Sequence, residues 1–165
     1  MIIQRPTPNS GTLFRSKTRT LETTMTLSQS LDQVFAFFSD PSNLQKLTPE
    51  GLDFQIVTPS PIDLREGAII DYRLKLLGIP FGWKTEIRVW EPPNCFVDFQ
   101  LKGPYQLWNH EHRFEAIEGG TLMTDHLTYR VFGGILENLV HALFVGPRVK
   151  EIFTYRTKAM NEIFG

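Results

Sequence analysis

The 165-residue sequence has little cysteine, almost no excess charge and no long apolar run. Its single cysteine, Cys95, excludes an internal disulfide and a zinc site built from several cysteines, and it favours a reducing, cytoplasmic location. Lys and Arg number 17 against 18 Asp and Glu, so the net charge of −1 provides no field for nucleic acid or an anionic membrane. No run approaches the roughly 18 apolar residues of a transmembrane helix. We therefore expect neither a nucleic-acid partner nor a transmembrane segment.

Common catalytic and cofactor patterns are missing as well. Gly133-Gly134 is not followed by a phosphate-binding loop, and no serine lies in a nucleophile elbow. The sequence therefore predicts no cofactor and assigns no metal ion.

Residues 1–18 predict a flexible N-terminal lead-in. They contain Pro6, Pro8 and Gly11, and they lack the apolar stretch of a secretory signal. Residues 19–165 suffice for a single domain with one core, which needs no disulfide to stay folded. The 13 Phe, three Trp and four Tyr residues are a generous aromatic supply, which indicates a large core or a pocket with aromatic walls.

The first half of the domain predicts one strand and two short helices. Residues 21–27 alternate in the manner of a half-buried strand. Ser30 and Gln33 form a capping box that predicts a helix start. Asp40-Pro41 ends this helix and begins a second, which Thr48-Pro49 ends.

A run of strands follows, over residues 54–57, 70–76, 83–89 and 96–102. The last of these permits two orientations. In one, Val97, Phe99 and Leu101 face the interior, and we favour it because it buries more apolar surface. In the other, the interior set is Phe96, Asp98 and Gln100.

Residues 107–131 predict a hairpin. A two-residue turn at Gly119-Gly120 would pair Phe114 with Asp125 and His112 with Leu127. Directly opposed residues share a face of the sheet. The inner face should then hold Trp108, His110, His112, Phe114, Met123, Asp125, Leu127, Tyr129 and Val131.

The pattern beyond Gly133-Gly134 is helical up to the C-terminus. One apolar stripe contains Ile135, Leu139 and Leu143. Gly146-Pro147 interrupts it, and because Pro costs about 3 kcal/mol inside a helix, we expect a kink or a restart there. A second stripe then runs from Val149 to Ile163.

Three segments carry a resemblance to a known family: GPYQLWNHEHRFEAIEGGT, DHLTYRVFGG and IFTYRTKAMNEIF. They resemble a bacterial ligand-binding subfamily of the SRPBCC superfamily, and the likeness covers roughly residues 19–165. The resemblance implies an α+β, helix-grip (START-like) fold. In it, a curved antiparallel sheet of about seven strands wraps a long C-terminal helix, and two short helices follow the first strand. Because the superfamily includes lipid carriers, hormone receptors, polyketide cyclases and co-chaperones, the fold alone says little about function.

The resemblance also implies a cavity between the sheet and the C-terminal helix. We expect it to bind or transport a small hydrophobic molecule, although close packing of the same side chains is an alternative for each apolar residue. The expected ligand-binding residues are Tyr72, Leu74, Trp83, Ile87, Trp108, His110, His112, Phe114, Asp125, Leu127, Tyr129, Val149, Ile152, Phe153 and Arg156.

The polar members of this set are the candidates for chemistry. His110, His112 and Asp125 could form a hydrogen-bonded patch, a metal site of two histidines and one carboxylate, or an acid–base pair. They could also be structural. For Arg156 we favour a side chain that reaches solvent at the helix edge, over a buried pair with Asp125 or a contact with a ligand acid group.

Three functions therefore remain open. The aromatic-rich predicted inner face favours a non-catalytic protein, present as a monomer or weak dimer, that binds a small apolar molecule of aromatic or isoprenoid type. A cyclase or dehydratase would use the His/Asp pair in the same cavity. A protein–protein interaction module would instead have a filled core and an exposed apolar patch.

Overall fold

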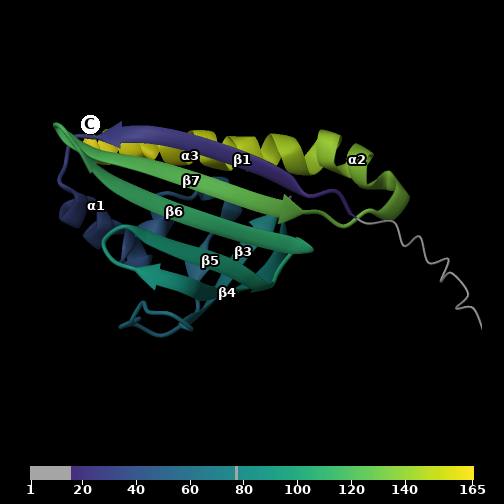
Figure 1. Cartoon of the computed structure of the whole chain (residues 1–165). Coiled ribbons are helices and arrows are strands. Elements are labelled where there is room, and N and C mark those ends of the chain that lie inside the picture. The colour runs from purple at the N-terminus through teal and green to yellow at the C-terminus, as the bar shows by residue number, and fades with distance from the viewer. Residues whose placement is uncertain (1–15, 77) are drawn as a thin grey trace, which may run out of the picture.

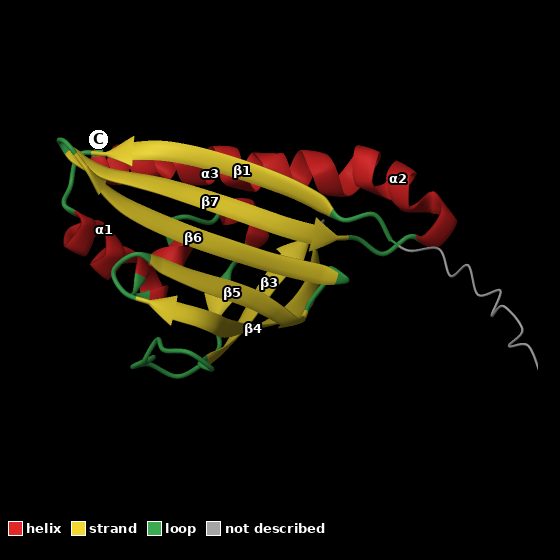
Figure 2. Ribbon diagram, viewed as in Figure 1, coloured by secondary structure: helices red, strands yellow, loops and turns green. Residues whose placement is uncertain are grey.

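Seven antiparallel strands form one curved sheet in the order β1-β7-β6-β5-β4-β3-β2 (Figures 1 and 2). The computed structural model describes residues 16–76 and 78–165. The strands are β1 (Arg19–Leu27), β2 (Gln55–Ile56), β3 (Ile69–Leu76), β4 (Ile79–Glu91), β5 (Cys95–Lys102), β6 (Leu107–Ile117) and β7 (Gly120–Arg130).

Helices cover one face of this sheet. After β1 come α1 (Leu31–Phe38) and the 3₁₀ helices η1 (Pro41–Gln45) and η2 (Glu50–Leu52). After β7 come η3 (Gly134–Leu136), α2 (Glu137–Val140), the π-helical turn η4 (His141–Val145) and α3 (Gly146–Phe164). In Figure 1, α3 runs along β1 and β7, and α2 projects beyond the end of the sheet. This arrangement confirms the α+β helix-grip architecture, with its seven strands and long C-terminal helix.

The local signals in the first half act as expected. Ser30 N–H donates to Gln33 Oε1 over 3.2 Å, as a capping box requires. The Asp40 side chain accepts from Ser42 N–H over 2.9 Å and so begins η1. Both short helices are confirmed, the second as a 3₁₀ helix. Residues 1–15 of the predicted lead-in lie outside the described residues, whereas Lys17 N–H donates to Glu137 of α2 over 2.9 Å.

The register of the β6–β7 hairpin differs by two residues from the predicted one. His112 lies opposite Asp125, and Phe114 lies opposite Met123. The turn is therefore Glu118-Gly119, where only Gly119 has a positive φ, of 83°. Gly120 serves another purpose, because a Cβ on it would lie 2.0 Å from the Leu27 carbonyl oxygen of β1. A shift of two residues leaves every side chain on its face, so the predicted inner face is confirmed.

The favoured orientation of β5 is wrong. Phe96 and Gln100 are buried, and Asp98 points to the same side. Of the predicted inward set, Val97 is also buried, but Leu101 is 46% exposed. Phe99 lies on the outer face, where the Arg88 guanidinium sits 3.1 Å from its ring centroid. Phe99 thus packs against Arg88 on the outer face of β5 and is not buried in the core. A count of apolar residues on each face of the strand does not predict such a contact.

The C-terminal helical region changes from the π-helical turn η4 to α3 at Gly146, but its backbone keeps right-handed helical angles there, so Pro147 lies in the first turn of α3 and no separate restart occurs. On α3, Val149, Phe153 and Met160 are buried against the sheet. The earlier stripe behaves differently, because Ile135, Leu139 and Leu143 are all more than half exposed. These side chains are exposed because α2 projects past the end of the sheet, where no strand of the described residues covers them. Among the described residues, no helix is both long and apolar enough to cross a membrane.

Candidate ligand cavity and its polar floor

Two adjoining cavities lie between the sheet, α3 and the short helices. The first has a volume of about 90 Å³ and is lined by Phe37, Phe38 and Phe96, so we call it the phenylalanine cavity. The second has a volume of about 150 Å³ and is lined by Trp83 and Trp108, so we call it the tryptophan cavity. The cavities meet because six residues line both: Leu44, Leu47, Tyr72, Asp98, His110 and Arg156.

Most of the residues predicted to line a cavity do so. Those at the wall of one or both cavities are Tyr72, Leu74, Trp83, Ile87, Trp108, His110, His112, Ile152, Phe153 and Arg156. Those that line neither are Phe114, Asp125, Leu127, Tyr129 and Val149. Phe114, Leu127 and Val149 are completely buried in the packed core. Tyr129 instead directs its hydroxyl to His141 Nε2, 2.8 Å away in η4.

The short helices and β5 also contribute to the cavity walls, and this was not predicted from the sequence. Phe37 and Phe38 of α1 and Leu44 of η1 form one wall of the phenylalanine cavity. The apolar face of the short helices was the available signal. Asp98 was missed because β5 was given the wrong orientation.

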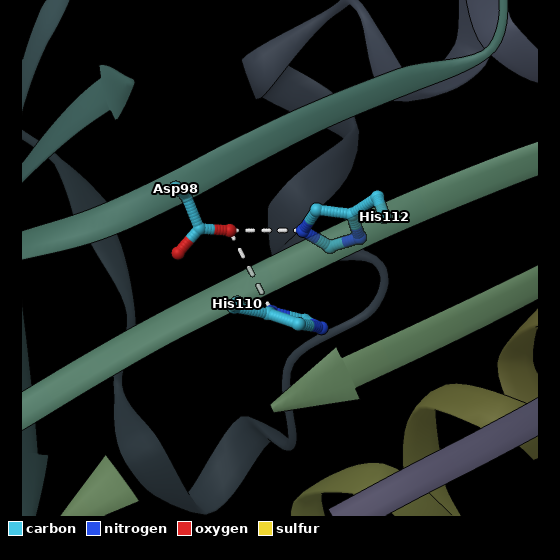
Figure 3. Close-up of side chains that lie close together, drawn as sticks. All are labelled: Asp98, His110 and His112. Carbon is cyan, nitrogen blue, oxygen red and sulfur yellow. Dashed lines mark hydrogen bonds and ion pairs between the residues drawn. The ribbon is translucent and has the colours of Figure 1, made fainter. Parts of the chain in front are cut away.

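Five polar side chains, all buried except Asp98, form one network at and directly behind the floor shared by the cavities. We call it the polar cluster; its members are Asp98 of β5, His110 and His112 of β6, Asp125 of β7 and Arg156 of α3. The sheet register brings them together, since His110 lies opposite Asp98 on one side, and His112 lies opposite Asp125 on the other. Figure 3 shows Asp98 directed at both histidines from the neighbouring strand.

Asp125 is the fully enclosed centre of the polar cluster. Its side chain is 0% exposed. Arg156 Nε donates to its Oδ2 over 2.9 Å, and its Oδ1 lies 3.0 Å from His110 Nε2 and 2.7 Å from His112 Nδ1. Burial would raise the pKa of Asp125, but Arg156 and the two histidines together hold it well below its usual range. Arg156 is thus a buried partner of Asp125, and the favoured prediction that it reaches solvent is wrong.

His112 sits between two carboxylates. Its Nε2 is 2.9 Å from Asp98 Oδ2, and its Nδ1 faces Asp125. Burial opposes the charged ring, but the hydrogen bonds to Asp125 and Asp98 outweigh it and raise the pKa of His112. Arg156 Nη2 also lies 3.2 Å from Nδ1, yet two donors cannot bond to each other. With the ring charged, His112 Nδ1 donates to the nearer Asp125 Oδ1. Arg156 Nη2 donates to the same oxygen over 3.3 Å.

His110 is the neutral member. Burial and then the neighbouring His112 charge lower its pKa, against the pull of the two carboxylates. Its Nε2 donates to Asp125, which leaves the Nδ1 lone pair directed toward Asp98 Oδ2, 3.5 Å away. A neutral imidazole at a cavity wall can accept a proton or a hydrogen bond.

The polar cluster is balanced in charge but open on one side. Burial would raise the pKa of Asp98, but the hydrogen bond from His112 and the nearby positive charges lower it, so Asp98 stays ionised. Two carboxylates then balance one imidazolium and one guanidinium. The Asp98 side chain is 22% exposed, more than any other member, and it lines both cavities. In Figure 3 one of its oxygens faces the histidines and the other is turned away.

Aromatic rings form the wall of the tryptophan cavity beside the polar cluster, with the ring centroids of Trp108 and His110 6.4 Å apart. Trp83 and Trp108 pack edge-to-face with ring centroids 5.2 Å apart, and Tyr105 lies 4.6 Å from Trp108. Trp83 Nε1–H donates to Thr85 over 3.1 Å, so its indole is fixed in place. The tryptophan cavity is therefore lined mostly by apolar side chains.

Comparisons with known proteins give the same fold. Among solved structures, protein Ms6760 from Mycobacterium smegmatis matches with a TM-score of 0.60 at 20% identity, over 87% of each chain. CV1439 from Chromobacterium violaceum matches with a TM-score of 0.67 at 12% identity, over 88% of this chain and 97% of that one. Ginseng major latex-like protein 151 from Panax ginseng matches with a TM-score of 0.64 at 11% identity, over 89% and 97%. At such identities the likeness concerns the fold alone.

A comparison of the sequence with family models is more specific than the structural likeness. None of the curated proteins matches it at a significant level. A family model described as polyketide cyclase / dehydrase and lipid transport matches residues 27–150, which include β2 to β7 and the whole polar cluster except Arg156. The chain therefore belongs to this polyketide cyclase / dehydrase and lipid-transport family.

Proposed function

We propose that this protein binds a small, mostly apolar molecule that carries one neutral polar group, in the joined phenylalanine and tryptophan cavities. The observation that carries the proposal is the arrangement of two apolar chambers over a single polar floor. Ligand sites are commonly apolar hollows with a few convergent polar groups that orient the ligand. Membership of a family that includes lipid transport supports the same function.

The volumes limit the size of the molecule. A cavity of about 150 Å³ holds a benzene-sized molecule, and the tryptophan cavity has that volume. With the neighbouring chamber of about 90 Å³, the space suits a compact molecule of one or two rings. A long acyl chain would require α3 or η1 to move away from the sheet.

The polar floor limits the chemistry of the molecule. Asp98 offers a carboxylate oxygen to the cavities, and Arg156 lines both of them. A hydroxyl can donate to the first group and accept from the second. A carboxylate on the ligand would face the Asp98 charge in a cluster that is already balanced, so it would bind more weakly.

Calorimetric titration with three matched probes tests the proposal. Naphthol, naphthalene and naphthoate share a bicyclic skeleton and differ in the polar group. We expect naphthol to bind at least tenfold more tightly than naphthoate, with naphthalene between them. Equal affinity of all three would contradict the role of the polar floor.

A cavity-filling substitution on α3 tests the location. Ile152→Trp places an indole in the tryptophan cavity, whose wall Ile152 forms, and should abolish binding of naphthol. Ile163→Trp on the same helix is the matched control, because Ile163 is 40% exposed and lines neither cavity. Binding that survives Ile152→Trp unchanged would place the ligand elsewhere.

A cyclase- or dehydratase-type reaction in the same cavity is the second candidate. The neutral His110 favours it, because an uncharged imidazole at the cavity wall is able to take a proton from a bound molecule. Asp125, which the sequence suggested as the acid–base partner of His110, orients the His110 ring through the nitrogen Nε2. If this candidate holds, His110→Gln should lower turnover of a substrate by about 10²–10⁴-fold while leaving its affinity within a few-fold. Unchanged turnover would refute the assignment.

A further inference from the structure

We propose that Asp98, His110 and His112 form a binding site for one divalent transition-metal ion, such as Zn²⁺, in the floor of the joined cavities. The site shares Asp98 and His110 with the polar floor of the organic-ligand proposal, but it rests on donor geometry and does not require an organic ligand to be bound. Its three donors are one carboxylate oxygen and two imidazole nitrogens, a ligand set that Zn²⁺ and Fe²⁺ use in proteins.

The spacing of the donor atoms fits a single ion. Asp98 Oδ2 lies 2.9 Å from His112 Nε2 and 3.5 Å from His110 Nδ1, and the three donors all lie within 4.8 Å of one another. Zinc bonds of about 2.0–2.1 Å in a tetrahedron put ligand atoms roughly 3.3 Å apart. The two separations from Asp98 lie on either side of that value, and the separation between the two imidazole nitrogens is at most 4.8 Å, so closing the site requires the two rings to turn toward a shared centre (Figure 3).

The remote nitrogens of both histidines are held by the same oxygen. His110 Nε2 lies 3.0 Å and His112 Nδ1 lies 2.7 Å from Asp125 Oδ1. Metal-binding histidines usually direct the second nitrogen at a carboxylate, which fixes the tautomer and the ring orientation. Arg156, bound to Asp125 over 2.9 Å, keeps that carboxylate ionised and in place.

One contact in the polar cluster favours a cation over a purely hydrogen-bonded network. With its proton on Nε2 toward Asp125, His110 presents a lone pair on Nδ1 to Asp98 Oδ2 across 3.5 Å. Two acceptors that face each other without a proton between them are unfavourable, and His110 is buried. An ion between them would satisfy both, and it would replace the proton that His112 shares with Asp98.

The assignment changes the roles expected from the sequence. The carboxylate considered there together with the histidines was Asp125, but the structure puts Asp125 behind the rings, on their remote nitrogens. Asp98 takes the ligand position from the opposite side. Because Asp98 and His110 line both cavities and His112 lines one, the remaining coordination positions would face the cavity space.

Cobalt provides a direct test on the full-length chain. Protein stripped with a chelator and titrated with Co²⁺ alone should develop a visible d–d absorption that saturates at one ion per chain, and excess Zn²⁺ should bleach it. Asp98→Asn and His112→Gln should each weaken the binding of Co²⁺ at least 100-fold. His126→Gln is the matched control and should leave it unchanged, because His126 lies on the outer face of β7 beside Glu22.

Asp125→Asn tests the orienting role separately and should weaken Co²⁺ binding about 10–100-fold, the usual effect of removing such a partner. No visible absorption in the unaltered protein would overturn the proposal. So would affinity that is unchanged in both Asp98→Asn and His112→Gln, since the ion would then sit elsewhere.

X-ray absorption spectroscopy of the unaltered protein loaded with Zn²⁺ tests the site without any substitution, so the result does not depend on whether the variants fold. A coordination shell of two imidazole nitrogens, with oxygen atoms in the remaining positions, would support the site. A spectrum without an imidazole signal would overturn it. The naphthol titration of chelator-treated protein is run alongside. The two titrations distinguish the proposals. If the protein binds naphthol but does not bind Co²⁺, only the proposed metal site is contradicted.

Discussion

The interior of this protein holds a group of charges, whereas one end of its surface holds a group of large apolar side chains. The polar cluster places two carboxylates, two histidines and an arginine beneath the sheet. The exposed apolar segment, which we define as residues 132–144, leaves six side chains more than half exposed: Phe132, Ile135, Leu136, Leu139, Leu143 and Phe144. Both regions reverse the usual partition of residues between core and surface.

The two regions differ in how the unfavourable placement is offset. Each member of the polar cluster has a charged or hydrogen-bonding partner within it, so the cost of burial is met inside one chain. Nothing in the described residues covers the exposed apolar segment in the same way. Internal pairing should therefore make the polar cluster important for stability, and the exposed segment should contribute little to it.

This contrast bears on the third function considered from the sequence. An interaction module was expected to combine a filled core with an exposed apolar patch. The patch is present, but the interior contains two cavities of about 90 and 150 Å³. The filled core is thus contradicted, and the patch alone does not distinguish the functions.

Breaking the polar cluster at its centre should have the largest effect. Asp125→Ala leaves Arg156 buried without its partner, so we expect the free energy of unfolding to fall by about 3–5 kcal/mol. Urea denaturation followed by tryptophan fluorescence measures it. Asp71→Ala is the matched control, because Asp71 pairs with Lys84 at the surface over 3.3 Å, and such pairs contribute about 0–1 kcal/mol. Similar losses in the two variants would mean that the cluster is not specially stabilising.

Substitution at the cavity side of the cluster should have a smaller effect. Asp98→Asn keeps an acceptor for His112, and its second polar atom faces the cavities, so we expect a loss of about 1–2 kcal/mol. The same denaturation experiment applies. A loss as large as that of Asp125→Ala would show that Asp98 is structural and not a cavity-facing group.

Acid should loosen the attachment of the exposed segment. The hydrogen bond from Arg19 and, secondarily, that from the Lys17 backbone, lower the pKa of Glu137 below its ordinary 4.5, against the opposing effect of burial. A lowered pKa means that the stabilisation is present above about pH 4.5 and is lost as the pH falls through the lower, folded-state value. Amide exchange in α2, corrected for the intrinsic rate, should rise between about pH 6 and about pH 3. Glu137→Gln should remove this pH dependence, and a dependence that persists would assign it to another group.

Polar substitutions in the exposed segment should have the smallest effect. Leu139→Ser and Leu143→Ser should each change the free energy of unfolding by less than about 0.5 kcal/mol, since neither side chain is buried. Met160→Ala on α3 provides the contrast, because Met160 is fully buried and its loss should cost about 2–5 kcal/mol. A large loss at Leu139 or Leu143 would indicate that the segment is covered in solution.

Periodicity was enough to predict most of the strands and helices and their order, and the family resemblance implied the fold, but neither predicted all of the site. The inner face of β6 and β7 could be predicted even with the wrong register, because an even shift preserves the side of the sheet. For β5, apolar residues occur on both sides, so counting them selected the wrong face and hid Asp98. The exposure of Leu139 depends on where the sheet ends relative to α2, and no local pattern contains that information. The partner of Arg156 depends on contacts 31 residues away along the chain.

The polar cluster also bears on the order of folding events. It joins β5, β6, β7 and α3, and its contacts connect residues separated by 31 and 44 positions. The contacts of Arg156 require α3 to have docked on the sheet, whereas the contacts among the strand residues of the cluster span only 14 and 15 positions and need only adjacent strands. Because distant segments lose more chain entropy before their contacts form, the contacts of Arg156 should be absent from the folding transition state. Changes at Arg156 should accordingly speed unfolding while leaving the rate of folding almost unchanged.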